Sequence, residues 1–117
     1  MAYFADNNPR AVAIIKDNLE KTRFTENSRV DRLPYAAFLR LVKENIDIAF
    51  IDPPYNRGII PKVMPLLLPR MNPGGIIVCE HEKELRLPEL LESPSGNPFV
   101  LEKEYSYGTI KVTIFRG

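Results

Sequence analysis

One stretch near the middle of the chain limits the possible folds more than any other. Residues 46–51 are almost all apolar and rich in β-branched side chains, with Asp47 as the single charged residue. A run of this length and composition predicts a central β-strand that is covered on both faces. The tetrapeptide Asp52-Pro53-Pro54-Tyr55 follows, and its prolines fix φ and keep the residues before them extended. The strand is therefore expected to end in a carboxylate on a stiff turn.

This tetrapeptide has the groups needed to methylate an exocyclic amino group. Such a nitrogen is a poor nucleophile, because its lone pair is delocalised into the aromatic ring. The Asp52 carboxylate and the Pro53 carbonyl can each accept a hydrogen bond from it, which turns the lone pair toward an electrophilic methyl. Pro54 stiffens the turn, and Tyr55 offers a ring on which a base swung out of its stack can lie. We predict these four residues as the catalytic group.

A simpler interpretation of the same residues exists. Asp-Pro-Pro is also a common sequence for ending a strand in a turn, and Tyr55 could be a packing residue in the turn that follows. The position directly behind an apolar strand favours the functional interpretation, because a motif carries weight only in the right structural context.

Length and composition set the outer limits. With 117 residues, 44% of them hydrophobic, the chain predicts a single domain over residues 1–117. Its 16 Lys and Arg residues nearly balance 15 Asp and Glu residues, so no global field indicates a polyanionic partner. The absence of a long apolar run predicts no membrane partner, and together with the lack of a signal peptide it indicates a cytoplasmic protein.

Two single residues bear on redox and metal chemistry. Cys79 is the only cysteine, so it can form no internal disulfide, and its apolar neighbours predict a buried small hydrophobe. His81 is the only histidine, and no metal-ligand spacing is present. We expect His81 at the surface or behind a functional site, and we predict no metal.

Apolar stretches alternate with segments of helical period, which predicts an α/β domain with a largely parallel sheet. Asn8-Pro9 is a typical helix start, and Pro34 opens the second helix. Pro65 predicts a break or kink in the third helix. The expected strands are 2–5, 28–31, 46–51 and 76–80, with a closing hairpin of 99–107 and 109–115; the expected helices are 9–22, 34–42 and 58–70, and 72–75 is expected to be a turn.

This order of elements resembles the class I S-adenosylmethionine-dependent methyltransferases, a Rossmann-like three-layer α/β/α sandwich. Four pieces look like the RsmD-type guanine-N2 methyltransferases of bacterial 16S ribosomal RNA. They are Ala5-Asp6-Asn7-Asn8-Pro9-Arg10-Ala11, Ile51-Asp52-Pro53-Pro54-Tyr55 with Gly58, Pro73-Gly74-Gly75-Ile76-Ile77-Val78-Cys79-Glu80, and Tyr107-Gly108-Thr109. The resemblance covers nearly the whole chain.

The resemblance implies a set of residues that bind S-adenosyl-L-methionine. Asp6, followed by Asn7, occupies the acidic position that binds both ribose hydroxyls, and a carboxylate at the carboxyl end of a strand suits a vicinal diol. Its alternative role is that of a turn aspartate beside the Asn8 cap. Pro34-Tyr35 stands where the family often has Asp or Asn before a small residue, so backbone contact or stacking on Tyr35 is expected for adenine. Asp52 completes the set.

The resemblance also points to a missing part. The fold class begins with a strand and a Gly-rich turn that approaches the cofactor closely, but every glycine here lies at position 58 or later. Without that strand, two unpaired edges are expected, on residues 2–5 and 46–51. We therefore expect the C-terminal major part of a methyltransferase domain, a fragment or shortened gene product. Its two halves close up, or it forms a homodimer or swapped assembly through these edges.

The sequence leaves three hypotheses for function. The leading one is methyl transfer from S-adenosylmethionine to guanine N2 of 16S ribosomal RNA, with ribosomal RNA or the small ribosomal subunit as partner. The second keeps the chemistry and changes the target to adenine N6 or another amine in DNA or RNA. The third is a non-catalytic remnant that self-associates and has lost cofactor binding.

Overall fold

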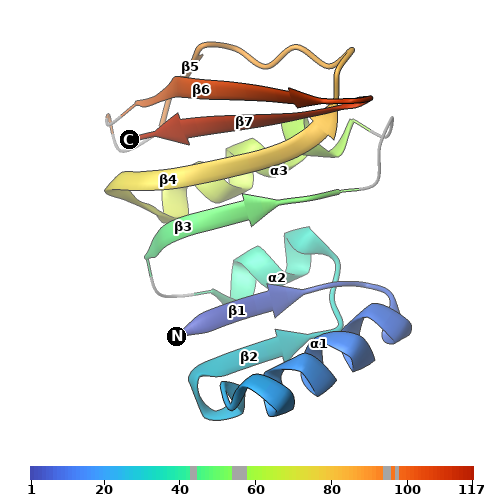
Figure 1. Ribbon diagram of the computed structural model, residues 1–117. Coiled ribbons are helices and arrows are strands. Elements are labelled where there is room, and N and C mark those ends of the chain that lie inside the picture. Colours follow the sequence, from blue (N-terminus) through green and yellow to red (C-terminus); the bar gives the residue numbers. More distant parts are fainter. Residues whose placement is uncertain (43–44, 54–57, 94–95, 97) are drawn as a thin grey trace. The chain divides into compact units, whose positions relative to one another are not determined.

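The computed structural model describes residues 1–42, 45–53, 58–93, 96 and 98–117 (Figure 1). Its elements fall into two compact units, Met1–Val42 and Lys43–Gly117. The two are described separately below, and the single domain over residues 1–117 stays a prediction. No helix in the described ranges combines the length and the apolar character needed to cross a lipid bilayer.

The first unit is a small two-stranded parallel sheet with two helices. It contains β1 (Ala2–Ala5), α1 (Pro9–Thr22), the 3₁₀ turn η1 (Thr25–Asn27), β2 (Ser28–Asp31) and α2 (Tyr35–Leu41). The strands pair in register from Ala2 with Ser28 to Ala5 with Asp31. Both strands and α1 have the predicted bounds, and α2 begins directly after Pro34, as predicted.

Local signals explain where α1 begins and ends. The Asn8 side chain accepts a hydrogen bond from the Arg10 amide at 2.8 Å, and Pro9 takes the first helical position. The helix ends at Arg23, a non-glycine residue in the left-handed region with φ of 62°. The ring of Tyr3 in β1 and the ring of Phe38 in α2 meet edge to face at 6.4 Å between centroids. The first unit therefore has a core of its own, although a small one.

The second unit is a five-stranded mixed sheet. Its elements are β3 (Ile46–Ile51), α3 (Ile59–Leu67), the 3₁₀ turn η2 (Leu68–Arg70), β4 (Met71–Glu82), β5 (Leu90–Leu91), β6 (Phe99–Tyr107) and β7 (Ile110–Arg116). The strand order is β3-β4-β7-β6-β5, and only β3 and β4 pair in parallel. The closing hairpin of β6 and β7 is confirmed. The sheet is nevertheless less parallel than predicted, because the pairings of β4 with β7, β7 with β6, and β6 with the unpredicted β5 are antiparallel.

In the second unit, the predicted break at Pro65 and the predicted turn at 72–75 were wrong. α3 continues through Pro65 to Leu67 without a break, since its inner side is deeply buried: Ile60, Val63 and Leu67 are at most 6% exposed. The predicted turn at 72–75 lies inside β4 as a bulge. Ile46 pairs with Met71 but Ile48 pairs with Ile76, so the bulged segment adds residues without ending the strand.

The two faces of this sheet differ sharply. Figure 1 shows α3 behind β4. One face carries the fully buried side chains of Ile77, Cys79, His81, Thr113 and Phe115, all at most 1% exposed. Burial raises the pKa of the Cys79 thiol to about 12, as fits the predicted small hydrophobe. His81 was expected at the surface or behind a site, but it is buried between strands.

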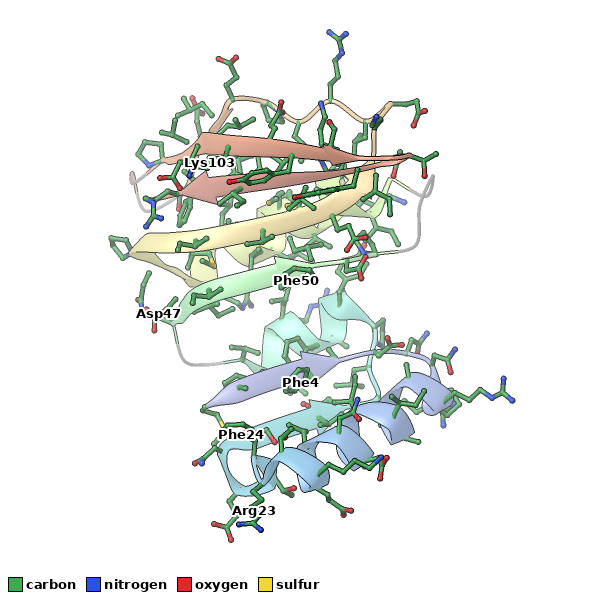
Figure 2. The ribbon with its side chains drawn as sticks, in the orientation of Figure 1. Phe4, Arg23, Phe24, Asp47, Phe50 and Lys103 are labelled. Atoms are coloured by element: carbon green, nitrogen blue, oxygen red, sulfur yellow. The ribbon has the colours of Figure 1, made fainter. Side chains whose placement is uncertain are left out.

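The other face leaves β3 open. Ile48 is 69% exposed and Phe50, labelled in Figure 2, is 65% exposed. The prediction that residues 46–51 are covered on both faces was therefore wrong. The predicted edges are confirmed within the described residues: β3 is the last strand of its sheet, and β1 has a single neighbour, β2.

Candidate active site

The second unit brings Asp52 beside an acidic residue that the sequence analysis gave no role. β3 and β4 are parallel, and their last paired residues are Ile51 and Cys79. The next residue on each strand is Asp52 and Glu80 respectively. Side chains alternate along β4, so the Glu80 carboxylate lies on the face opposite Cys79, and it is near enough to Asp52 to interact with it electrostatically.

Asp52 is exposed, yet its carboxylate is electrostatically perturbed. Partial desolvation raises its pKa above the ordinary value, and the neighbouring Glu80 carboxylate raises it further. A group of this kind is a stronger hydrogen-bond and proton acceptor than a solvated aspartate.

The rest of the tetrapeptide is described only in part. Pro53 follows Asp52 and is half-buried. Pro54 and Tyr55 lie outside the described residues, so the stiff turn and the stacking ring stay predictions. Asp47, at the start of β3, has a structural role instead: its Oδ1 accepts a hydrogen bond from the Asn72 amide at 2.7 Å and ties β3 to the β4 bulge (Figure 2).

Asp6 ends β1 in the first unit. Its amide donates to the Asp31 carbonyl at 3.2 Å, which extends the β1–β2 ladder by one residue. Its Oδ1 accepts a hydrogen bond from the Asn8 amide at 2.8 Å, the contact expected of a turn aspartate. A carboxylate has about four acceptor positions, so this bond fixes Asp6 without using up its capacity.

The other predicted cofactor residues gather at the same end of the first unit. Asn7 is exposed in the turn after Asp6. Pro34 precedes α2 with φ of −65°, and Tyr35 is the half-buried first residue of that helix. They follow the carboxyl ends of β1 and β2, where open α/β sheets bind nucleotides. The predicted residues thus form one group in the first unit and another, with Asp52, in the second.

Sequence reasoning missed Glu80 as a functional candidate. The signal was present, because Glu80 directly follows the apolar residues 76–79 just as Asp52 follows 46–51. What the sequence lacked was the pairing of β3 with β4 and its register. Among the described residues, no three His, Cys, Asp or Glu side chains come together in a way that could hold a metal ion.

Comparisons with known proteins agree with this architecture. A family model described as "Conserved hypothetical protein 95" matches residues 1–116. A Bacillus subtilis protein, "Putative rRNA methyltransferase YlbH", is 27% identical over 97% of this chain and 61% of its own length. The chain therefore spans about three fifths of that relative.

Solved structures share the fold. A conserved hypothetical protein of Streptococcus pyogenes aligns with a TM-score of 0.85 and 26% identity, over 98% of this chain and 70% of that one. SMU.1697c of Streptococcus mutans, a "putative methyltransferase" solved in complex with SAH, aligns with a TM-score of 0.65 and 16% identity, over 98% of this chain and 75% of that one. The chain belongs to the family described as Conserved hypothetical protein 95, the RsmD-type class I methyltransferases that its motifs resemble.

Proposed function

We propose that this chain is the major part of an S-adenosylmethionine-dependent methyltransferase that modifies an exocyclic amino group, with guanine N2 of 16S ribosomal RNA as the favoured target. The observation that carries the proposal is the Asp52 carboxylate at the exposed carboxyl end of β3, with its pKa raised. The name of YlbH, an rRNA methyltransferase, supports the choice of ribosomal RNA. The SAH complex of SMU.1697c supports the cofactor.

In this proposal the chain holds and orients the amine. When bound, S-adenosylmethionine supplies an electrophilic methyl group. Asp52 and the Pro53 carbonyl accept hydrogen bonds from the amino group, which aligns its lone pair, and Tyr55 stacks on the base. Pro54 keeps these acceptors in place. The proton leaves the nitrogen after methylation, so no strong base is needed.

The first unit fits the nucleoside part of the cofactor. Asp6 is half-buried, and its Oδ1 is fixed by the Asn8 amide, which leaves its remaining lone pairs for ribose hydroxyls. Asn7 adds polar atoms in the same turn, and Tyr35 at the start of α2 offers a ring for adenine. These residues match the chemistry of an adenosine, and no metal enters the proposed reaction.

Two substrates are compatible with this chemistry. The favoured partner is ribosomal RNA or the small ribosomal subunit, and we expect the protein to act in the cytoplasm. Adenine N6, or another amine in DNA or RNA, is the alternative with the same chemistry. Incubation with labelled S-adenosylmethionine, with small ribosomal subunits in one sample and duplex DNA in another, separates them. Labelled N2-methylguanosine from the subunits supports the proposal. Labelled N6-methyladenine from either sample would show that the target is adenine N6 and not guanine N2.

The remaining alternative is a non-catalytic remnant. The exposed Ile48 and Phe50 on an edge strand favour it, because they offer a surface for self-association. Calorimetric titration with S-adenosylmethionine distinguishes the two. Micromolar binding that Asp6→Ala weakens, but the matched surface change Asp17→Ala does not, supports the enzyme. The absence of heat and of a thermal shift favours the remnant.

A further inference from the structure

Three side chains of β6 share the open face of the second sheet. Lys103, Tyr105 and Tyr107 are two positions apart along the strand, so they lie on one face at intervals of about 7 Å. Glu104, between the first two, pairs with Thr113, which belongs to the buried face. Lys103, Tyr105 and Tyr107 therefore lie on the opposite face, and we call them the β6 strip.

The two tyrosine rings of the β6 strip are open to solvent. Tyr105 is 40% exposed and Tyr107 is 63% exposed. Neither hydroxyl group has a hydrogen-bond partner within the described residues. Each ring is thus a free, flat surface on a strand, and such a surface is suited to stacking against an unpaired nucleobase.

Lys103 supplies the charge of the β6 strip. Its side chain is exposed (Figure 2), and it has no ion-pair partner in the part of the chain that the structure describes. The acidic residues on either side are paired with other cations. Glu102 lies 3.1 Å from Arg116, and Glu104 lies 3.7 Å from Lys111. A free positive charge beside two aromatic rings is the combination by which proteins hold single-stranded nucleic acid.

The β6 strip lies on the same face of the sheet as Glu80 and level with it. Tyr105 pairs with Val112 of β7, and Val112 pairs with Glu80 of β4. Glu80 in turn is close enough to Asp52 for their charges to interact. At about 4.8 Å per strand, β6 is about 10 Å from β4 and about 14 Å from β3. A short segment of RNA can therefore reach the β6 strip and Asp52 at once.

The hairpin turn fixes the end of the β6 strip. Tyr107 and Ile110 pair across a two-residue turn, in which Gly108 has φ of 56°. A glycine with positive φ at the first position of such a turn matches the twist of the two strands. The Thr109 carbonyl accepts a hydrogen bond from the Lys83 amide at 3.3 Å, which ties the turn to the segment after β4. A ring held on such a turn loses little freedom when a base stacks on it.

We propose that the β6 strip binds single-stranded RNA beside the nucleotide that is methylated, with the two tyrosine rings stacked on unpaired bases and the Lys103 ammonium group on a phosphate. This inference rests on the proposed function, because it makes the strip part of the substrate site of Asp52. Stacking accepts any base, so the strip contributes affinity and position and does not select the target. The β3 end of the same face, with Ile48 and Phe50, is apolar and suits contact between copies of the chain instead.

RNA binding tests the stacking without relying on activity. Fluorescence anisotropy would follow a labelled single-stranded RNA of about 12 nucleotides, which is within the site sizes of such surfaces. Tyr107→Leu should raise Kd at least about fivefold through the loss of one stacked base, whereas Tyr107→Phe keeps the ring and should leave Kd near the wild-type value. Phe24→Leu, at an exposed ring of the first unit, is the matched control and should also leave it unchanged. Equal effects of Tyr107→Leu and Phe24→Leu, or no binding by the wild-type chain, would overturn the inference.

The salt dependence of Kd tests the phosphate contact. Lys103→Ala should reduce the slope of log Kd against log salt concentration by about 0.7, the value for one contact with a single strand. Lys16→Ala, an exposed lysine on α1, should not change the slope. An unchanged slope in Lys103→Ala contradicts the contact. If Tyr107→Leu changes the size of the particle in size-exclusion chromatography but not the affinity for RNA, the strip is a contact between copies and the proposal is wrong.

Methyl transfer separates this inference from the proposed function. With a chain that transfers methyl, Tyr107→Leu should raise KM for the RNA and change kcat little, because the ring holds the substrate and not the reacting atoms. Transfer with the same KM in this variant refutes the role of the strip and leaves the proposed function intact. Tyr107-dependent RNA binding by a chain that neither binds S-adenosylmethionine nor transfers methyl refutes the proposed function and leaves the strip as an RNA-binding surface.

Discussion

At the scale of single residues, the Asp52 carboxyl group links the site to the stability of the fold. Its pKa is raised in the folded chain by desolvation and by Glu80, so the folded state binds its proton more tightly than the unfolded state does. Stability from this group is therefore fully present below the unfolded pKa and declines as the pH rises through the folded pKa. At neutral pH the ionised Asp52 carboxylate therefore lowers the stability of the fold. The proposed reaction gives a reason for its presence, because it uses this carboxylate.

This sign gives a direct prediction for Asp52→Asn. The substitution removes the charge with little change of shape, so the denaturation midpoint at pH 7 should rise above that of the wild-type chain. The gain should vanish below about pH 3.9, where the unfolded carboxyl group is protonated as well. Urea melts at both pH values measure it, with Glu84→Gln in an exposed turn as control. A variant that is less stable at pH 7 would contradict the prediction.

His81 and Thr113 form a buried polar pair between β4 and β7. His81 Nδ1 lies 2.8 Å from the Glu82 carbonyl, which can only accept, so Nδ1 carries a proton. Nε2 lies 2.8 Å from the Thr113 hydroxyl, and the two satisfy each other. Both side chains are at most 1% exposed, so neither can exchange its partner for water.

Thr113→Val should therefore be costly despite its similar volume. It leaves His81 Nε2 buried without a partner, and we expect a loss of about 1–3 kcal/mol in the free energy of unfolding. Thr109→Val, in the exposed turn of the hairpin, should stay within about 0.5 kcal/mol of wild type. Chemical denaturation measures both. Equal effects of the two substitutions would show that the pair contributes nothing specific.

These residues also mark what the sequence could predict at this scale. The Asn8 cap and the burial of Cys79 follow from neighbours in the chain, so local patterns were enough. The burial of His81 depends on Thr113, which is 32 positions away and meets it only when β4 pairs with β7. Likewise, Glu80 became a candidate only through the register of β3 against β4.

At the scale of elements, the bulge of β4 shows how glycine permits a close approach. Gly75 is buried, and a Cβ at this position would meet the Asp47 carbonyl oxygen at 2.9 Å and the Asn72 carbonyl oxygen at 3.0 Å. Both are backbone atoms that cannot move independently. The β4 bulge is thus packed tightly against the start of β3, and the Asp47–Asn72 hydrogen bond links the two.

Gly75→Ala should destabilise this piece. Because backbone atoms must shift to admit the methyl group, we expect a loss of about 1–3 kcal/mol in the free energy of unfolding. Lys83→Ala, an exposed position just after the same strand, serves as a control and should have little effect. Thermal or urea unfolding measures the difference. A Gly75→Ala variant as stable as the control would mean that the bulge relaxes freely.

Most elements could be predicted because their signals are local and strong. The Asn8 cap predicted the start of α1, and β1, α1 and β2 have the predicted bounds, as nearly does the hairpin of β6 and β7. Burial of the apolar side of α3 outweighed the helix-breaking tendency of Pro65. This burial depends on the tertiary structure, so it could not be predicted from the local sequence. β5 has two residues, Leu90–Leu91, and owes its existence to pairing with β6 rather than to a pattern of its own.

At the scale of the whole molecule, the most important feature is the unpaired edge and exposed apolar face of β3. Within the described residues, β3 is the outer strand of its sheet and carries two large exposed apolar side chains, Ile48 and Phe50. The sequence predicted the edge correctly, from the absence of a Gly-rich first strand. It also predicted cover on both faces, which was wrong because an apolar run indicates what a strand can bury and not what is present to cover it.

Self-association is the expected result at this scale. We predict that the chain elutes larger than a monomer in size-exclusion chromatography with light scattering at high concentration. Ile48→Lys should shift it toward the monomer, because a charge on an edge strand opposes pairing. Phe24→Lys, at an exposed position of the first unit, should not. A clean wild-type monomer at high concentration would remove the edge as an interface.

The central claim is that Asp52 serves methyl transfer to an amino group, and one assay tests it most directly. Labelled S-adenosylmethionine and unmodified small ribosomal subunits would be incubated with the wild-type chain and with Asp52→Ala, after circular dichroism has shown that both are folded. The account predicts label in 16S ribosomal RNA, recovered as N2-methylguanosine, with the wild-type chain, and a loss of at least about a hundredfold with the variant. Equal transfer by both chains, or none by the folded wild-type chain, would contradict it.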